Sequence, residues 1–397
     1  MKARRINSNT IRKINATRVF HAIRRHPGIS PQALSASTEI DLATISIILT
    51  TLEQDGLIIR SLQPRTGRSG RPSSLVSINE ASGVLAGVGI DVDKIQIVLC
   101  SYAGTKLAQL TIPGSLHVQT VVDSITAAIN SLLQQTNTPS SMLTGVGVGI
   151  AGLVGLDGRL ALAPALGWHE IDLAEQLTTT LGVPVHLEND IKAAATAESL
   201  FGNVTQVSDF IYLSGRSGLG GGFFLGGGLY RGPHGMAGEI GHMKLIPNGR
   251  LCTCGGHGCF ETYASEQAIF NSLREAGLNF SNLASVREAA LNKNPGTLAV
   301  LAQSGQYLGL GLANLANIFA PNSIVLGSVL AVLADFLLPT ARPVFEANTL
   351  KEIYRDIVLT ISTLDDNATP MGGVAVALQC FLEEPPSGII KLINPSR

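Results

Sequence analysis

Four side chains of the type that binds transition metals lie within eighteen residues of one another, in a stretch rich in glycine. They are His242, Cys252, Cys254 and Cys259. A structural zinc ion takes four tetrahedral thiolate and imidazole ligands, so one histidine and three cysteines complete its coordination and leave no open position. Three of the five cysteines of the chain are concentrated here, although a glycine-rich hairpin with incidental cysteines is the alternative. We therefore predict one structural Zn²⁺ ion per chain.

The same stretch carries two carboxylates that the metal does not need. Glu239 lies three residues before His242, and Glu261 lies two residues after Cys259. A metal that pins both ends of the loop would fix these acids relative to each other. Carboxylates held in this way suit the hydroxyl groups of a polar ligand such as a sugar. The metal would then shape a ligand site without taking part in chemistry.

The elements that position these groups belong to a body of α/β type. The chain has 397 residues and 45% hydrophobic content, which is enough for two or three domains with sizeable cores. From Gly83 onward, small and β-branched residues form segments in which strands are followed by helices. We expect strands over 83–93, 94–103, 106–113 and 143–154, a helix over 121–136, and a glycine-rich hairpin over 209–235.

A further strand, PVHLEN, runs directly into a helix at Glu188, Asn189 and Asp190. Open α/β sheets bind their ligands at the carboxyl ends of their strands. Asn189 and Asp190 are therefore candidates to hold ligand hydroxyls. The alternative is that these residues only cap the helix, which is a common role of asparagine and aspartate.

The charges of the chain are divided unevenly between its two ends. Residues 1–72 carry twelve Lys and Arg against four Asp and Glu, whereas the remainder carries sixteen against twenty-five. A basic head on an acidic body is the charge distribution of a nucleic-acid-binding module joined to a domain with another task. Contact with anionic lipid, or a simple gain in solubility, are the alternatives.

The pattern within the head predicts a helix-turn-helix. Helices are expected over 10–26, 31–38 and 42–55, with Ser30 and Asp41 as the N-caps of the second and third. In the third helix, the apolar residues expected in the core are Ile45, Ile48, Leu49 and Leu52. The residues left to contact a major groove of DNA are Thr44, Ser46, Ile47 and Thr50.

Two predicted strands, 57–62 and 74–79, follow the third helix and make the head a winged helix. The segment between them carries Arg65, Arg68 and Arg71 among glycines. An arginine in an extended backbone can enter a minor groove, where narrow A·T tracts concentrate negative potential. A solvated loop charge is the alternative for each arginine, but the three together in this context favour contact with DNA.

Taken together, these motifs resemble the ROK family (repressors, open reading frames, kinases), in its transcription-regulator branch. The winged helix, Glu188-Asn189-Asp190, and the segments GEIGH (238–242) and CTCGGHGCFE (252–261) carry the resemblance, which covers nearly the whole chain. It implies an N-terminal winged helix-turn-helix followed by a two-lobed, sugar-kinase-like α/β body of the actin and hexokinase type. The expected divisions are 1–80 for the DNA-binding domain, 81–190 plus 370–397 for the first lobe, and 191–369 for the second lobe with the zinc loop.

The resemblance also implies roles for single residues. The positions that contact sugar hydroxyls in the family correspond to Asn189, Asp190, Glu239, His242 and Glu261. The positions of the zinc ligands correspond to His242, Cys252, Cys254 and Cys259, so His242 would serve both sets. In members of the family that phosphorylate sugars, the aspartate at the position of Asp190 is the base.

The chain departs from the kinases of the family where those enzymes hold ATP. Their Asp-x-Gly-Gly-Thr-Lys loop is replaced here by Asp91-Val92-Asp93-Lys94, which lacks both glycines and adds a carboxylate. Side chains and a negative charge then stand where backbone amides would meet phosphates. The second phosphate loop keeps its glycines over 217–222 but has Arg216 inserted before Ser217. We therefore expect that the chain is not an enzyme. A second departure is Ala165, where relatives often carry asparagine, and it leaves the identity of the sugar open.

These observations favour a sugar-responsive transcriptional regulator, and a repressor in particular. It would bind operator DNA as a homodimer or homotetramer and change its affinity when a small sugar closes the cleft. A sugar kinase with an added DNA-binding domain is the alternative, and a regulator controlled by a protein partner is a third reading. Since no uninterrupted apolar stretch of eighteen residues and no signal peptide are found, we expect a cytoplasmic protein without membrane contact.

Overall fold

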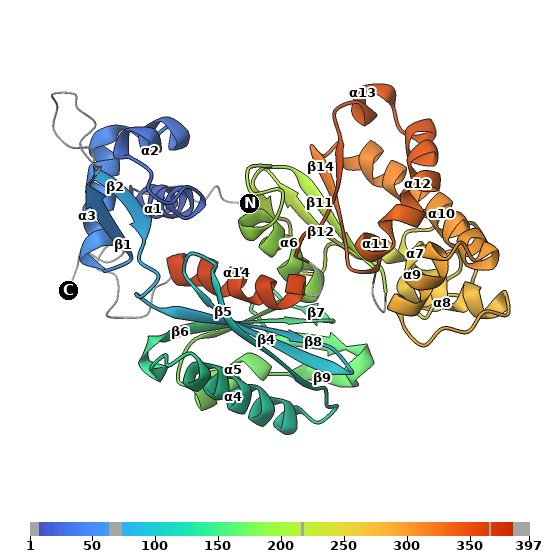
Figure 1. Ribbon diagram of the computed structural model, residues 1–397, viewed down its shortest axis with the longest axis horizontal. Coiled ribbons are helices and arrows are strands. Elements are labelled where there is room, and N and C mark those ends of the chain that lie inside the picture. Colours follow the sequence, from blue (N-terminus) through green and yellow to red (C-terminus); the bar gives the residue numbers. More distant parts are fainter. Residues whose placement is uncertain (1–7, 63–73, 216–217, 365–366, 384–397) are drawn as a thin grey trace.

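The structure is a computed structural model that describes residues 8–62, 74–215, 218–364 and 367–383. A small head and two larger lobes, each built on a five-stranded sheet, make up the molecule (Figure 1). Within the described ranges, no single helix has both the length and the apolar content of a membrane span. The bent pair of helices Pro31–Thr38 and Leu42–Gln54 reaches these criteria only when the two are taken together, by length and composition alone.

The head has the predicted order of three helices and a two-stranded wing. Its elements are α1 (Ser8–Arg25), α2 (Pro31–Thr38), α3 (Leu42–Gln54), β1 (Ile58–Leu62) and β2 (Ser74–Ile78). Ser30 and Asp41 cap α2 and α3, since their side-chain oxygens accept from the backbone amides of Ala33 and Thr44. The four apolar residues of α3 predicted in the core, Ile45, Ile48, Leu49 and Leu52, are all buried. The wing arginines Arg65, Arg68 and Arg71 lie outside the described residues.

The first lobe is a sheet of order β10-β6-β3-β4-β5, in which β10, β6 and β3 run parallel. Its elements are β3 (Val84–Ile90), β4 (Lys94–Ser101), β5 (Lys106–Pro113), α4 (Val118–Gln135), η1 (Ser140–Met142), β6 (Leu143–Ile150), α5 (Leu173–Leu181) and β10 (Val185–Asn189). The strands and the helix expected from the sequence are thus all present. A small antiparallel sheet, inserted before α5, comprises β7 (Leu153–Val154), β8 (Leu160–Ala163) and β9 (Trp168–Ile171), with η2 (Pro164–Leu166) before β9.

Helices cover both faces of this sheet (Figure 1): α4 and α5 pack on one face, and α14 (Ala368–Glu383) on the other. The glycines of β3 and β6 let α14 approach very closely. A Cβ on Gly87 would lie 1.9 Å from Pro370 O, and a Cβ on Gly147 would lie 1.9 Å from Gly373 O. The last described helix of the chain is therefore packed against one of its first strands.

The second lobe has a sheet of order β13-β12-β11-β14-β15. Helix α6 (Asp190–Phe201) connects the two lobes, since it follows β10 of the first sheet and packs against both α14 and β12. The elements of the second lobe are β11 (Phe210–Ser214), β12 (Gly220–Leu225), β13 (Gly228–Leu229), η3 (Ile240–His242), α7 (Glu261–Ala264), α8 (Glu266–Glu275), α9 (Leu283–Leu291), α10 (Pro295–Phe319), β14 (Ser323–Gly327), α11 (Val329–Val332), α12 (Ala334–Asn348), α13 (Lys351–Tyr354) and β15 (Val358–Ile361). Strands β11 and β12 form the predicted glycine-rich hairpin.

One core joins the head to the body. The same apolar cluster contains Phe20 and Ile23 of α1, Leu200 of α6, and Phe381 and Leu382 of α14. Figure 1 shows the head beside the end of α14. Because a shared core has no water between its parts, the head and the body pack as continuous protein along this boundary.

A histidine beside this boundary should make stability fall in acid. Burial and the charges of Arg24 and Arg25 lower the pKa of His21 from 6.5 to about 3. In the unfolded chain His21 is protonated below about pH 6.5, whereas in the folded chain it stays neutral down to about pH 3. The folded state therefore loses stability relative to the unfolded state as pH falls from 6.5 to about 3. At pH 5 the loss amounts to about 2 kcal/mol relative to pH 8.

The measurement is urea unfolding at pH 8 and at pH 5. His21→Gln should show a smaller drop in the unfolding midpoint between these two pH values than the wild-type chain. His117→Gln, which replaces an exposed histidine of the first lobe, serves as the control and should keep the wild-type drop. Equal drops in all three chains would contradict the expectation.

Candidate functional site

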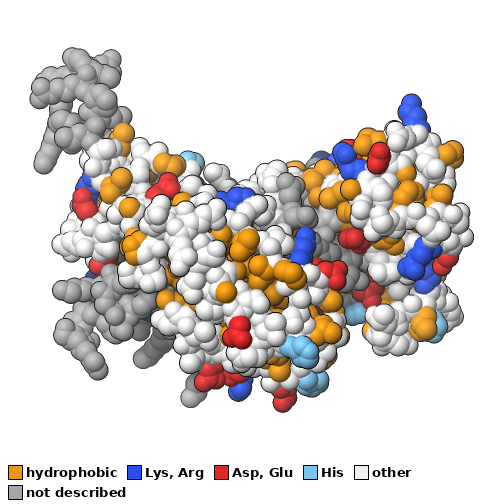
Figure 2. Space-filling view, turned by 60° about the horizontal axis from the view of Figure 1, so that its bottom comes forward, with side chains coloured by type: hydrophobic (Ala, Val, Ile, Leu, Met, Phe, Trp, Pro, Cys, Tyr) orange, Lys and Arg blue, Asp and Glu red, His pale blue; other side chains and the backbone are white. Residues whose placement is uncertain are grey.

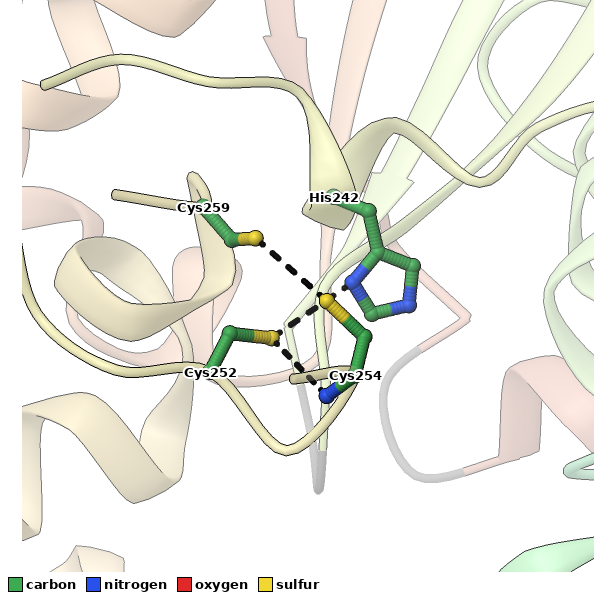
Figure 3. Close-up of side chains that lie close together, drawn as sticks. All are labelled: His242, Cys252, Cys254 and Cys259. Atoms are coloured by element: carbon green, nitrogen blue, oxygen red, sulfur yellow. Dashed lines mark hydrogen bonds between the residues drawn. The ribbon is translucent and has the colours of Figure 1, made fainter. Parts of the chain in front are cut away.

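The four predicted metal ligands come together at one point of the second lobe. One ligand atom from each of His242, Cys252, Cys254 and Cys259 lies within 4.8 Å of all the others (Figure 3). Two sulfurs bound to a tetrahedral zinc ion at about 2.3 Å stand about 3.8 Å apart. The Sγ atoms of Cys254 and Cys259 are 3.7 Å apart, and Cys252 Sγ lies 3.6 Å from His242 Nδ1. These separations, and the donor set itself, fit a tetrahedral metal ion.

The loop reaches this shape through short backbone pairings and one obligatory glycine. The residue pairs Lys244 and Cys259, and Leu251 and His257, form isolated antiparallel bridges that fold the loop back on itself. Gly258 has a φ of +71°, and a Cβ there would lie 1.7 Å from Ile246 O. Only glycine fits at this position, directly before the last cysteine ligand.

The charges around the four ligands favour thiolates. The backbone amide of Gly256 is the main cause that lowers the pKa of the Cys254 thiol to about 7. Lys244 Nζ donates to Cys259 Sγ at 2.7 Å, and this contact raises the pKa of the lysine. Three thiolates around a divalent cation leave one negative charge, which the lysine offsets.

Burial and the neighbouring Glu261 carboxylate act in the other direction on Cys252. They raise the pKa of its thiol to about 12, and Cys252 Sγ donates to Glu261 Oε1 at 2.8 Å. A divalent cation stabilises a thiolate far more strongly than a hydrogen bond does. With a metal bound, Cys252 would lose this proton, and the Glu261 carboxylate would be free to accept hydrogen bonds from other donors.

All five predicted sugar residues line one cavity of about 820 Å³ next to the metal cluster. They are Asn189, Asp190, Glu239, His242 and Glu261. The first two come from the junction of β10 and α6, whereas the other three come from η3, the residue before it, and the first turn of α7. The surface in Figure 2 is hollowed between the two lobes, with acidic side chains along the hollow. Ala165 also lines the cavity, so this departure from the family bears directly on the ligand.

His242 and Glu261 connect the cavity to the metal cluster. His242 Nδ1 faces the sulfur atoms, while the second ring nitrogen points away from them (Figure 3). Glu261 Oε1 lies 3.5 Å from His242 Nδ1. A metal on Nδ1 fixes the tautomer of the imidazole, so that the second nitrogen carries the proton and can donate to a ligand oxygen.

Asn189 plays the capping role that the sequence left open. Its Oδ1 accepts from the amides of Ile191 and Lys192, both at 3.1 Å. Its Nδ2 donates to Gly152 O and to Asp190 Oδ1, again at 3.1 Å each. Because both donor hydrogens are used within the protein, Asn189 orients Asp190 more than it reaches into the cavity.

Lys192, which the sequence analysis did not single out, is a buried cation close to the carboxylates of Glu188 and Glu239. Its side chain is 3% exposed, and its Nζ donates to Gly235 O at 2.5 Å. Burial lowers the pKa of Lys192, while the carboxylates of Glu188 and Glu239 oppose that shift. A lysine among the alanines of α6 was the available signal, since a buried lysine requires an acceptor or a countercharge.

The two stretches considered for phosphate binding have local structural roles. In the turn that replaces the kinase phosphate loop, the amide of Val92 donates to Asp91 Oδ1 at 2.8 Å. The glycines of β12 make room for α6, because a Cβ on Gly222 would lie 2.4 Å from the Cβ of Ala195. Arg216 and Ser217 lie outside the described residues.

The residues of α3 predicted to meet DNA are on its outer surface. Ser46, Ile47 and Thr50 are exposed, and Ile47 keeps 60% of its surface accessible although it is apolar. Thr44 is half-buried, and its hydroxyl donates to the capping carboxylate of Asp41 at 2.6 Å. Thr44 is therefore already engaged in the helix cap.

Comparison with known proteins covers both parts of the chain. A model of the ROK family matches residues 85–380, and a model of the MarR family matches residues 13–69. The xylose repressor of Bacillus subtilis strain 168 is 30% identical over 376 residues, which cover 94% of this chain and 97% of that protein. The predicted fold, a winged helix-turn-helix followed by a sugar-kinase-like body, is thereby confirmed.

Two solved structures extend the comparison. A ROK family transcriptional regulator, a homologue of the E. coli MLC protein, has a TM-score of 0.79 and 28% identity, covering 94% of this chain and 97% of that one. A ROK family glucokinase from Streptomyces griseus, in complex with glucose and AMPPNP, has a TM-score of 0.66 and 28% identity, covering 75% of this chain and all of that one. Regulators and kinases are thus both among the relatives.

Proposed function

The chain belongs to the ROK family, and we propose that it is a transcriptional repressor whose affinity for operator DNA responds to a small sugar. A similar protein over nearly the full length is a xylose repressor. The observation that carries the proposal is that one chain joins a winged helix with an exposed α3 to a cavity lined by Asp190, Glu239 and Glu261. Carboxylates are strong acceptors for sugar hydroxyls, and they come here from two separate segments of the chain.

The proposed mechanism is a shift between an open and a closed cleft. A sugar that contacts Asp190 on one side and Glu239, His242 and Glu261 on the other binds the closed form better than the open one. The operator would be read by two copies of the chain, whose recognition helices must lie about 34 Å apart or a multiple of this distance. Closure that changes this separation changes the affinity for DNA. For a repressor, we expect sugar to release the operator.

We propose that the ion held by His242, Cys252, Cys254 and Cys259 is Zn²⁺ with a structural role. The donor set and the ligand separations support zinc, since four protein ligands close a tetrahedral site. The ion would hold His242 and Glu261 in place at the edge of the cavity and supply no catalytic group.

We further propose that the chain does not phosphorylate its sugar. The turn at Asp91 is closed by a bond from its own amide to Lys94 O, and the amide of Val92 is taken up by the Asp91 side chain. These bonds, and the packing of the β12 glycines against α6, leave few backbone amides to hold ATP phosphates. The glucokinase relative and the retained Asp190 favour the alternative, a kinase with an added DNA-binding head. Incubation with ATP, Mg²⁺ and the bound sugar separates the two: formation of sugar phosphate would overturn the proposal.

The function is tested with selected DNA and a panel of sugars. An operator is recovered from random DNA on the immobilised chain, and D-xylose, D-glucose and N-acetyl-D-glucosamine are titrated by calorimetry. We expect one panel sugar to bind and to change the dissociation constant for the operator by about 5-fold or more, the lower end for coupled sites. A sugar that binds without any effect on DNA would contradict the proposal.

A charge on the outer face of α3 should abolish operator binding. Thr50→Glu places a carboxylate beside the phosphates and base edges of the major groove, and we expect a loss of at least about 10-fold in affinity. Thr180→Glu on α5 is the matched control, since both threonines are exposed on helices. Both also donate to the carbonyl four residues back, at 2.9 and 2.8 Å. Equal affinities of the two variants in a gel-shift titration would remove α3 from the interface.

A further inference from the structure

One helix has the sugar cavity at its first residue and the head at its last. Helix α6 begins at Asp190, which lines the cavity, and ends at Phe201, which packs against the core that contains α1. In Figure 1 this helix lies in the middle of the molecule, beside α14. A rigid, packed element that reaches two sites can carry coupling between them.

Two arginines of the head hold the far end of α6. Arg24 Nη2 donates to Leu200 O at 2.6 Å, and the guanidinium of Arg24 lies 4.9 Å from the centre of the Phe201 ring. Arg25 Nη1 donates to Thr205 O at 2.9 Å, just beyond the helix. The last carbonyls of a helix carry partial negative charge and have no partner within the helix, so a cation there is favourable.

The Arg24 contact is buried and well ordered by its neighbours. Arg24 is 9% exposed, and its Nε lies 3.5 Å from Nδ1 of His21. A buried guanidinium cannot leave its acceptors for water without a large cost. When the carbonyl of Leu200 moves, Arg24 and the end of α1 therefore have to follow it.

Close packing along α6 prevents the helix from bending between its ends. A Cβ on Gly222 of β12 would lie 2.4 Å from the Cβ of Ala195, and a Cβ on Gly372 of α14 would lie 2.3 Å from the carbonyl carbon of Ala193. Near the far end, Ser362 donates to the buried Glu198 carboxylate. Helices packed this tightly shift as units.

We propose that Arg24 is a positioning residue that couples the two sites: it passes the movement of α6, set by a sugar on Asp190, to the DNA-binding head. This inference rests on the proposed function and adds the route of its regulation. The 12 residues of α6 span about 18 Å, so a tilt of about 5° at the sugar end displaces the other end by about 1.6 Å. Such a displacement exceeds the tolerance of a 2.6 Å hydrogen bond, so α1 moves with the carbonyl.

The test compares Arg24→Met with Arg18→Met in the full-length chain. Both variants keep an unbranched side chain and lose one arginine bond to the last turn of a helix. Arg18 Nη2 donates to Thr38 O of α2 at 2.8 Å, which lies within the head. The quantity measured is the ratio of the operator dissociation constants with and without a saturating concentration of the panel sugar that binds the wild-type chain.

We expect the wild-type chain and Arg18→Met to keep a ratio of about 5 or more, and Arg24→Met to fall close to one while it still binds both the sugar and the operator. Arg24→Lys, which keeps a donor and the charge, should restore part of the ratio. Since coupling is reciprocal, the operator should also stop changing the sugar affinity of Arg24→Met. If Arg24→Met keeps the wild-type ratio, the coupling role of Arg24 is overturned, while the proposed function still stands.

Arg25→Met covers the case in which Arg24→Met does not fold. Arg25 is exposed, so its replacement leaves the core intact, and we expect a partial loss of the ratio. If no Arg24 variant folds and Arg25→Met keeps the wild-type ratio, the coupling through the end of α6 is overturned. A ratio of one in the wild-type chain overturns the proposed function itself, and with it the coupling role of Arg24.

Discussion

Asp190→Asn should weaken sugar binding at least about 100-fold. A hydrogen bond from a hydroxyl to a carboxylate contributes about 1.5 to 3 kcal/mol, and two such bonds to adjacent hydroxyls account for a factor of this size. The replacement also disturbs its neighbour, because Asn189 Nδ2 donates to Asp190 Oδ1 at 3.1 Å and would then face a second amide. Calorimetry with the panel sugar gives the dissociation constant directly.

The same variant should still bind the operator and should no longer respond to the sugar. The matched control is Asp172→Asn, since Asp172 pairs with Arg159 at 2.9 Å and does not line the cavity. Asp172→Asn should bind sugar like the wild-type chain. Unchanged sugar affinity in Asp190→Asn would place the sugar elsewhere in the cleft and would remove the first residue of α6 from the mechanism.

Local spacing was sufficient to predict the metal cluster. The ligands lie within one short loop, so glycines and tight turns decide their geometry with little help from the rest of the chain. The buried face of α3 was predictable for a similar reason, since Ile45, Ile48, Leu49 and Leu52 repeat at helical intervals. The strand before Asn189 likewise follows from a short apolar run that meets a capping residue.

Contacts between distant segments were not predictable. Arg24 and Arg25 contribute to the positive charge of the head, which the sequence analysis took as a sign of nucleic-acid binding. In the structure, both donate to backbone carbonyls of the body instead. The glycines of β12 resemble a phosphate loop until α6 is seen to pack against them. The bond from Asn189 Nδ2 to Gly152 O and the bond from the buried Lys192 to Gly235 O likewise join segments 37 and 43 residues apart.

Removal of the metal should cost both local stability and sugar binding. Cys254→Ser replaces a thiolate ligand by a poor one, and we expect the zinc content to fall from about one per chain toward zero. Without the ion, Lys244 stands beside sulfur atoms that repel one another when ionised, and the turns around Gly258 lose their anchor. His242 and Glu261 would then no longer be fixed at the cavity, so sugar affinity should fall at least about 10-fold, the effect typical of lost metal-site support.

The head should be spared, because its own core and its contacts with α6 and α14 do not include the loop. Operator binding of Cys254→Ser in the absence of sugar should therefore stay within about 2-fold of wild type, as expected for two sites that share no interaction partners. Cys380→Ala is the control, since it removes a cysteine outside the cluster and should keep zinc, sugar affinity and operator binding. The zinc content, the sugar affinity and the operator affinity of the wild-type chain and the two variants are measured by metal analysis, calorimetry and gel shift. Full sugar affinity in a zinc-free Cys254→Ser chain would show that the acids keep their places without the metal, and the zinc would then serve the fold alone.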